Sequence, residues 1–183
     1  MSSENVAASA HAMGSHFEFE HAMTFMPGEK RWSKKVSTVP IVTTLKQMYT
    51  SVELVSLEVD VVQLALIGTA KTQLYLNGAC FVGLIPTAKD TDADTGTNNT
   101  TVLSVPKKHA IQLSSQEQTT RTFKLDLKGY ELDLAQDPRR GQGPVFWIGN
   151  TGIGVFEGAP ATLAIMAVVW RGKLSCSGTS TLW

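Results

Sequence analysis

The chain has 183 residues, 43% of them apolar and only 17% charged, and its 16 basic residues balance 16 acidic ones. This length suits a single domain with a sizeable core, and a charged fraction below the usual value of about 25% indicates that part of the surface is buried against another molecule. A net charge near zero favours association and argues against a strongly basic protein that coats nucleic acid.

The N-terminal part of the chain separates into an arm and the start of a folded domain. Residues 1–14 are small and polar without an apolar period, which predicts a mobile arm, and the domain is expected to span residues 15–183. Residues 16–20 alternate in polarity and predict a short strand. Residues 40–49 carry apolar side chains four and three positions apart, which predicts one or two helical turns.

Alternation with a period of two residues is strongest in the middle of the chain. Residues 53–61 and 122–128 predict two strands, each with one apolar and one polar face. A further long strand is predicted over residues 71–84, and Pro86 is expected to end it. The residues expected to face the core from the first two strands are Val55, Leu57, Val59, Val61, Phe123, Leu125 and Leu127.

The C-terminal part completes the predicted architecture. Residues 145–149 predict a short apolar strand, residues 150–160 a glycine-rich loop, residues 163–170 a central strand, and residues 175–183 a tail of small residues. About eight strands separated by turn signals, with little helix, predict an all-β fold. We expect an eight-stranded jelly-roll β-sandwich with a flexible N-terminal arm, because the loops are longer than barrel hairpins.

The cysteines and the apolar runs bear on the compartment. Cys80 and Cys176 are too few for a disulfide framework, so we expect buried free thiols in a reducing compartment. The first 30 residues contain no charged segment followed by an apolar one, so no signal peptide is expected. The longest apolar run, residues 163–170, falls far short of the roughly 20 residues that span a bilayer. We expect a soluble protein that is intracellular where it is made.

Histidines supply the first candidate site. His11, His16 and His21 are spaced five apart, which places them on one face of neither a helix nor a strand, and no histidine-based metal motif is present. Two interpretations stay open for these three residues. They are ordinary surface residues, or they belong to a proton-gated arm that faces RNA, since histidine titrates near physiological pH.

Three aspartates in a polar loop supply a candidate metal site. Asp90, Asp92 and Asp94 resemble the start of a calcium loop, but an EF-hand requires glycine at position 6 and glutamate at position 12. Thr95 and Thr101 occupy those positions, so the EF-hand interpretation fails. A looser calcium site between subunits and a simple solvated loop both stay open, and no cofactor is expected.

A short basic segment supplies a candidate RNA contact. Four basic residues surround Trp32, and basic residues mixed with an aromatic one are typical of single-strand nucleic-acid sites. Residues 1–29 carry four glutamates and no lysine or arginine, which opposes phosphate binding. We therefore expect at most a weak, salt-sensitive and non-specific contact. Its basic residues are Lys30, Arg31, Lys34 and Lys35.

No catalytic motif is present. The sequence contains neither a Gly-x-Ser-x-Gly elbow nor a P-loop. Alternation places Glu58 and Asp60 on one sheet face, where they form either an acid–base pair of a glycosidase or an ordinary solvated or interface face. We expect the second arrangement and a protein that is not an enzyme.

Several segments together resemble tymovirus coat proteins. The family has a Phe-x-Phe-Glu stretch, a Thr-Phe pair, a short helical piece ending near a tyrosine, and then a long strand. The matching segments here are His16–Glu20, Thr24–Phe25, Val36–Ser37, Leu45–Tyr49 and Leu54–Val61, with Thr72–Pro86 and Ala161–Ser175 resembling the next and the final strands.

This resemblance implies a jelly-roll subunit of a quasi-equivalent icosahedral shell around positive-strand RNA. Coat proteins of the family lack a long arginine-rich arm, and they share RNA neutralisation with polyamines and protonated inner groups. The resemblance thus implies that His11, His16 and His21, when protonated, help to neutralise RNA inside the shell.

We therefore expect a coat protein that assembles with its own copies around single-stranded RNA, has no membrane partner, is located in the virion and is assembled in the host cytoplasm. The alternative is a carbohydrate-binding jelly-roll module with exposed aromatics among Trp32, Trp147 and Trp170, although the last two are expected in the core. A cupin-like enzyme is a third alternative, which the missing histidine–glutamate metal signature disfavours.

Overall fold

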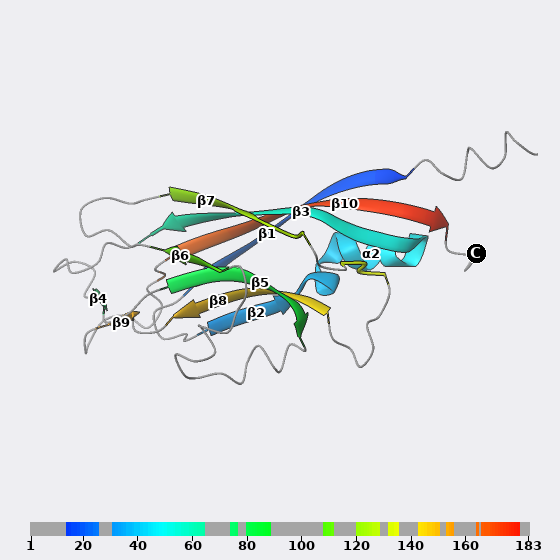
Figure 1. Ribbon diagram of the computed structural model, residues 1–183. Helices are drawn as coiled ribbons and strands as arrows, with labels where there is room; N and C mark the ends of the chain where they lie inside the picture. Colours follow the sequence, from blue (N-terminus) through cyan, green and yellow to red (C-terminus); the bar gives the residue numbers. More distant parts are fainter. Residues whose placement is uncertain are drawn as a thin grey trace, which may run out of the picture.

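Two antiparallel four-stranded sheets form the two layers of the molecule (Figure 1). The computed structural model describes residues 14–25, 31–64, 74–76, 80–88, 108–111, 120–128, 132–135, 143–150, 153–155, 164 and 166–179. Sheet A has the order β1 (Ser15–Phe25), β10 (Met166–Thr179), β3 (Tyr49–Gln63) and β7 (Thr120–Leu125). Sheet B has the order β2 (Arg31–Lys35), β8 (Gly143–Asn150), β5 (Cys80–Ala88) and β6 (His109–Ile111). The predicted eight-stranded jelly roll is confirmed.

A small third sheet and one helix complete the described structure. β4 (Leu74–Leu76) pairs with β9 (Ile153–Val155) outside the sandwich. A 3₁₀ turn, Val36–Thr38, leads into α2 (Pro40–Met48), where Pro40 occupies the first helical turn and lacks only an N–H that would have no intrahelical partner. Val42 and Leu45 bury one side of α2, which confirms the predicted helical turns.

The core lies between the two sheets, and alternate residues of each strand fill it. Leu57, Val59 and Val61 point inward from β3, as predicted, and Trp170 and Phe146 stack against each other from opposite sheets with centroids 4.7 Å apart. Both tryptophans expected in the core are buried, with Trp147 1% and Trp170 0% exposed. None of the described helices is long and apolar enough to cross a membrane.

One residue of β3 departs from the prediction. Val55 was expected to face the core but is 54% exposed. The pairing of β3 with β10 shifts at this point, because Lys173 pairs with Ser56 and the next residue, Leu174, pairs with Leu54. Val55 is therefore the extra residue of a β-bulge, and the inward positions change from odd to even numbers on its N-terminal side.

The long strand predicted over residues 71–84 is wrong. The chain forms β4 and β5 there, and these strands belong to different sheets. Pro86 does not end β5, and the strand continues to Ala88. The pairing of β5 with β8 is irregular between Ile85 and Ala88, so it requires no backbone N–H from the proline.

Two C-terminal boundaries also differ from the prediction. β9 lies within the segment predicted as a glycine-rich loop, and β10 continues to Thr179 through the first part of the predicted tail. Alternation explains the extension, because Leu174 and Cys176 are buried whereas Lys173 and Ser177 are exposed. This segment of small residues is therefore part of a strand, because its inward positions are still apolar.

Candidate assembly surfaces

The outer face of sheet A carries rows of opposite charges that cross the strands. Strand pairing aligns Glu20 of β1 with Arg171 of β10, Arg171 with Glu58 of β3, and Glu58 with Lys124 of β7. We call these four residues the charged row. Acidic and basic side chains alternate from strand to strand along it, and opposite charges on neighbouring strands stabilise a sheet.

Ion pairs and hydrogen bonds connect this face. Arg171 Nε donates to Glu20 Oε2 at 3.1 Å, and Arg171 Nη1 donates to Asp60 Oδ2. Asp60 also accepts a hydrogen bond of 2.7 Å from Thr122 Oγ1. Next to the charged row, Lys173 Nζ lies 3.0 Å from Glu18 Oε1. Asp60 thus belongs to a network of ion pairs and hydrogen bonds, and Glu58 lies beside it on the same outer face, in agreement with the expected solvated or interface face.

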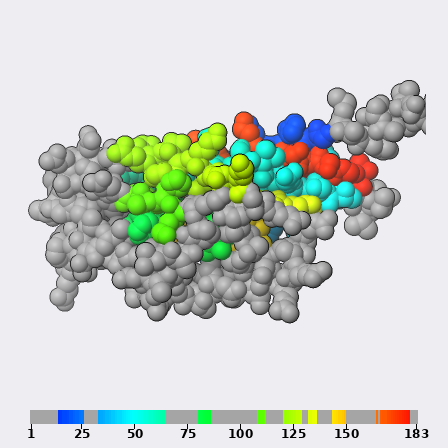
Figure 2. All heavy atoms as spheres, viewed as in Figure 1, coloured from blue at the N-terminus to red at the C-terminus, as the bar shows by residue number. Residues whose placement is uncertain are grey.

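The network is open to solvent. The side chains of Glu20 and Arg171 are 59% and 53% exposed, and only that of Asp60, at 15%, is well covered. The hydrogen bond to Glu20 and the charge of Asp60 raise the pKa of Arg171, so this guanidinium stays charged. Figure 2 shows β1, β3, β7 and β10 along the upper side of the molecule. Exposed pairs contribute little to folding, so the face is available for a partner.

The outward positions of β5 and β8 in sheet B are apolar instead. Val145 and Trp147 point away from the main core, are 0% and 1% exposed, and pack with Phe81 and Ile85 of β5. Gly149 leaves the space that the Trp147 ring occupies, since a Cβ at this glycine would overlap the indole. The strand β8 is therefore buried on both faces, which explains its continuous apolar sequence.

The buried tryptophans bear on the carbohydrate-binding alternative. Trp147 and Trp170 cannot stack on a sugar from inside the protein, and the side chain of Trp32 lies outside the described residues. Neither indole Nε1 has a hydrogen-bond acceptor among the described residues. A buried donor without an acceptor costs on the order of 1–3 kcal/mol. Of the three aromatics that the carbohydrate-binding alternative would use, two are therefore core residues, as expected.

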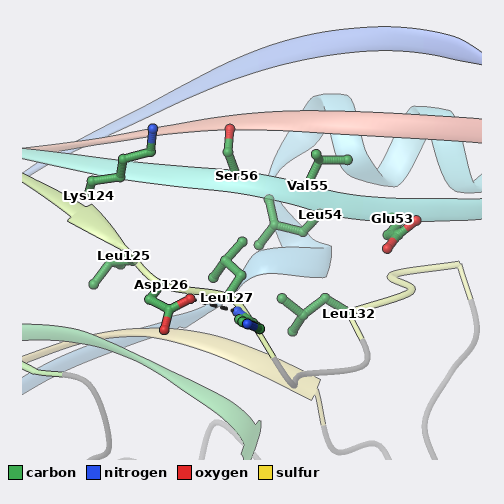
Figure 3. Close-up of a pocket in the computed structure, with 10 residues that line it drawn as sticks. Glu53, Leu54, Val55, Ser56, Lys124, Leu125, Asp126, Leu127 and Leu132 are labelled. Carbon is green, nitrogen blue, oxygen red and sulfur yellow. Dashed lines mark hydrogen bonds between the residues drawn. The ribbon is translucent and has the colours of Figure 1, made fainter.

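A groove of about 540 Å³ opens where β7 leaves β3 (Figure 3). β7 ends at Leu125, opposite Leu57, and the chain returns farther along β3, where Leu54 N donates to Leu132 O at 3.0 Å. Leu54, Leu127 and Leu132 line the groove, and Val55 and Lys124 lie at its outer side. The bulge and the early end of β7 thus create the groove together.

The two described histidines of the predicted RNA-facing set lie on opposite faces of β1. His16 is exposed on the outer face of sheet A, whereas His21 is half-buried and stacks on Phe146 with centroids 6.2 Å apart. Loss of solvation, and then the positive charge of Lys34, lower the pKa of His21. One surface cannot present both histidines, and His11 lies outside the described residues.

The structure describes only part of the other predicted sites. Lys34 and Lys35 lie on β2, the edge strand of sheet B, whereas Lys30 and the side chain of Arg31 lie outside the described residues. Asp90, Asp92 and Asp94 also lie outside them, and the part that is described contains no group of three metal-binding side chains. Both sites stay predictions.

The cysteines are buried and unpaired, as predicted. Burial raises the pKa of the Cys80 thiol to about 12. Burial, and then the charge of Asp133, raise the pKa of Cys176. Because the thiolate is the reactive form, both thiols are structural apolar groups at neutral pH.

No family model and no curated protein matches the sequence. The structure matches solved structures of viruses. A chain of turnip yellow mosaic virus superimposes with a TM-score of 0.59 over 93% of this chain and 98% of that chain, at 14% identity. This chain has the jelly-roll fold of virus capsid subunits. Desmodium yellow mottle tymovirus gives a TM-score of 0.61 at 10% identity, covering 93% of this chain and 91% of that chain.

The capsid fold extends beyond tymoviruses. A chain of tobacco necrosis virus superimposes with a TM-score of 0.51 at 9% identity, covering 91% of this chain and 98% of that chain. The predicted resemblance to tymovirus coat proteins is thus confirmed for the fold, which accounts for nearly the whole chain.

Sequence reasoning missed the two basic residues that β10 contributes to this face. Alternation predicts a last strand that ends at Trp170, and the resemblance, which extends the final strand to Ser175, assigns neither Arg171 nor Lys173 to a face. The signal was present in residues 170–176, where apolar and polar residues alternate around Gly172. Lys124 and Glu58 were placed on the polar faces of their strands, but the pairing of these strands was unknown.

Proposed function

We propose that this protein is a capsid subunit whose copies assemble into a closed icosahedral shell around single-stranded RNA. The observation that carries the proposal is the match of the two-sheet topology, over 93% of the chain, to chains of two different tymoviruses. The low charged fraction and the zero net charge support it, because they favour association of like subunits.

The role we propose is structural and not enzymatic. No nucleophile elbow or P-loop occurs in the sequence. The acidic pair on β3 that a glycosidase would need is occupied in part by Arg171 and Thr122, which bind Asp60. The subunit acts through contacts with symmetry-related copies, which give a closed shell when many weak interfaces form together.

The finer parts of the proposal follow from the sequence. Residues 1–14 form the arm inside the shell, and residues 15–183 form the shell domain. RNA contacts are weak and non-specific, through His11, the basic segment Lys30, Arg31, Lys34 and Lys35, and only one of His16 and His21, because these two histidines lie on opposite faces of β1. Calcium at Asp90, Asp92 and Asp94 is a candidate link between subunits. The mature location is the virion, after assembly in the host cytoplasm.

Electron microscopy of the purified full chain tests the proposal. We expect uniform closed particles of about 30 nm, the scale expected when many subunits of about 20 kDa close under point-group symmetry. The protein is imaged with and without added single-stranded RNA, and with calcium or a chelator. Only monomers or small oligomers under all four conditions would contradict the proposal.

A further inference from the structure

We infer that the outer face of sheet A binds the same face of a second copy, with a two-fold axis that runs parallel to the strands. This inference goes beyond the proposed shell, because it assigns one defined interface and one defined orientation. It rests on the order of charges in the charged row and on which of these charges lack an ion-pair partner among the residues that the structure describes.

The order of charges is complementary to its own reversal. From β1 to β7 the charged row reads Glu20, Arg171, Glu58 and Lys124, that is, negative, positive, negative and positive. A two-fold axis parallel to the strands, between β10 and β3, reverses the strand order in the facing copy. Glu20 then lies opposite Lys124 of the second copy, and Arg171 lies opposite its Glu58, so all four contacts join opposite charges.

The other in-plane two-fold axis gives the opposite result. An axis perpendicular to the strands keeps the strand order, so each strand faces its own copy and every contact of the charged row joins like charges. Like charges that face each other across an interface weaken its binding. The charge order therefore selects one orientation of the two copies.

Two members of the charged row have no ion-pair partner among the described residues. Glu58 and Lys124 make no ion pair with any described residue, whereas Glu20 and Arg171 bind each other. The second copy supplies the missing charges, since Glu58 faces Arg171 and Lys124 faces Glu20 across the axis. The charged row, whose four charges sum to zero, thus gains two further pairs of opposite charge on each copy.

The two rows on one side of the charged row differ in character. Val169 and Asp60 form the first, so reversal places Val169 opposite Asp60 of the second copy, whose carboxylate is already bound by Arg171 and Thr122 of its own chain. Ala167 and Val62 form the second. Reversal places the small side chain of Ala167 opposite Val62 of the second copy, which is an apolar contact. The axis therefore passes through a charged zone and an adjoining apolar zone.

Sheet dimensions are consistent with this contact. Packed sheets cross at about 30°, so an outer strand is displaced by about 4 Å relative to the strand that it faces in the second copy. Glutamate and lysine side chains are long enough to span this displacement. Four strands about 4.8 Å apart and about 30 Å long cover roughly 600 Å² on each copy. This area lies below the roughly 800 Å² per partner of a standard stable interface, so we expect a weak, salt-sensitive dimer.

The test reverses two charges that are far apart within one chain and opposite each other across the axis. In Glu20→Lys the two new contacts join lysines, and in Lys124→Glu they join glutamates, so each variant is expected to dimerise about tenfold or more weakly than the unchanged protein. Mixing the two variants restores both contacts with opposite charges. Sedimentation velocity at low salt, on the fraction without particles, measures the association.

Recovery of the dimer on mixing supports the inference, because the two charges sit on the two outermost strands and cannot compensate each other within one chain. Lys46→Glu on α2, which changes the net charge as Lys124→Glu does, is expected to dimerise normally. If Glu20→Lys does not fold, Glu20→Gln replaces it. Its mixture with Lys124→Glu is then expected to associate more strongly than either variant alone.

Three results would overturn the inference: an unchanged protein that stays monomeric at about 100 µM, equal dimerisation of all variants, or no recovery on mixing. These results are distinguishable from failure of the proposed function. Particles without a dimer through this face contradict the interface and leave the capsid proposal standing. A dimer that responds as expected but never forms particles supports the interface and contradicts the capsid proposal.

Discussion

The outer faces of the two sheets differ sharply although the same alternation builds both. On sheet A the outward positions of β10 and β3 carry Arg171, Glu58 and Asp60, and the ion pairs of Arg171 with Glu20 and Asp60 lie on a face that is open to solvent. On sheet B the outward positions of β8 carry Val145 and Trp147, which are buried. Sheet A is therefore a surface that a partner can bind reversibly, whereas the outward side of β8 in sheet B is part of the folded interior.

The largest expected effect comes from placing a charge on the inner face of sheet A. Leu125→Asp buries a carboxylate where Leu125 is 4% exposed, which is expected to cost about 4 kcal/mol or more and to prevent folding. The neighbouring Lys124→Ala, on the outer face, is expected to change the unfolding free energy by less than about 0.5 kcal/mol. Denaturant unfolding compares them, and soluble, native-like Leu125→Asp protein would show that the face assignment is wrong.

A smaller but still large effect is expected on the outer face of sheet B. Trp147→Ala removes a fully buried indole and is expected to cost about 3–5 kcal/mol. Trp147→Phe keeps most of the ring and removes an N–H that has no acceptor among the described residues, so its cost is expected to be much smaller. Equal stability of Trp147→Ala and the unchanged protein would mean that this face is not packed in solution.

Close packing inside sheet A is tested by a single methyl group. A Cβ at Gly172 would overlap the ring of Phe19, which is 6% exposed. Gly172→Ala is expected to cost about 1–3 kcal/mol through overpacking. The double variant Gly172→Ala with Phe19→Leu is expected to recover part of this loss, as measured by thermal unfolding. Additive losses in the double variant would argue against contact between the two residues.

The smallest effect concerns pH at the edge between the sheets. The lowered pKa of His21 means that the unfolded chain binds a proton more readily than the folded one. Stability is therefore full above the ordinary histidine pKa of about 6.5, and it decreases as pH falls toward the depressed folded value. His21→Gln is expected to flatten this decrease in denaturant unfolding between about pH 5 and pH 7.5.

His16→Gln is the matched control, because His16 is exposed on the opposite face of the same strand. It is expected to leave the pH profile of the unchanged protein in place. A profile that responds to His16→Gln and not to His21→Gln would assign the pH dependence to the outer face of sheet A instead.

By itself the sequence determined the fold class, the helical turns of α2 and most inward positions, because the period of apolar residues is a local property of each segment. It also determined that Trp147, Trp170 and the two cysteines are buried. Even the faces of β3 were predictable as far as the bulge, where Val55 reverses the alternation.

Only the tertiary structure decided which strands pair, because these contacts join segments that are distant in the chain. His21 lies opposite Trp170, and Glu58 lies opposite both Arg171 and Lys124. No local period specifies such partners, since closing a long loop depends on the whole sandwich. The charged row, the groove at Val55 and the buried second face of β8 exist only once those distant strands are side by side.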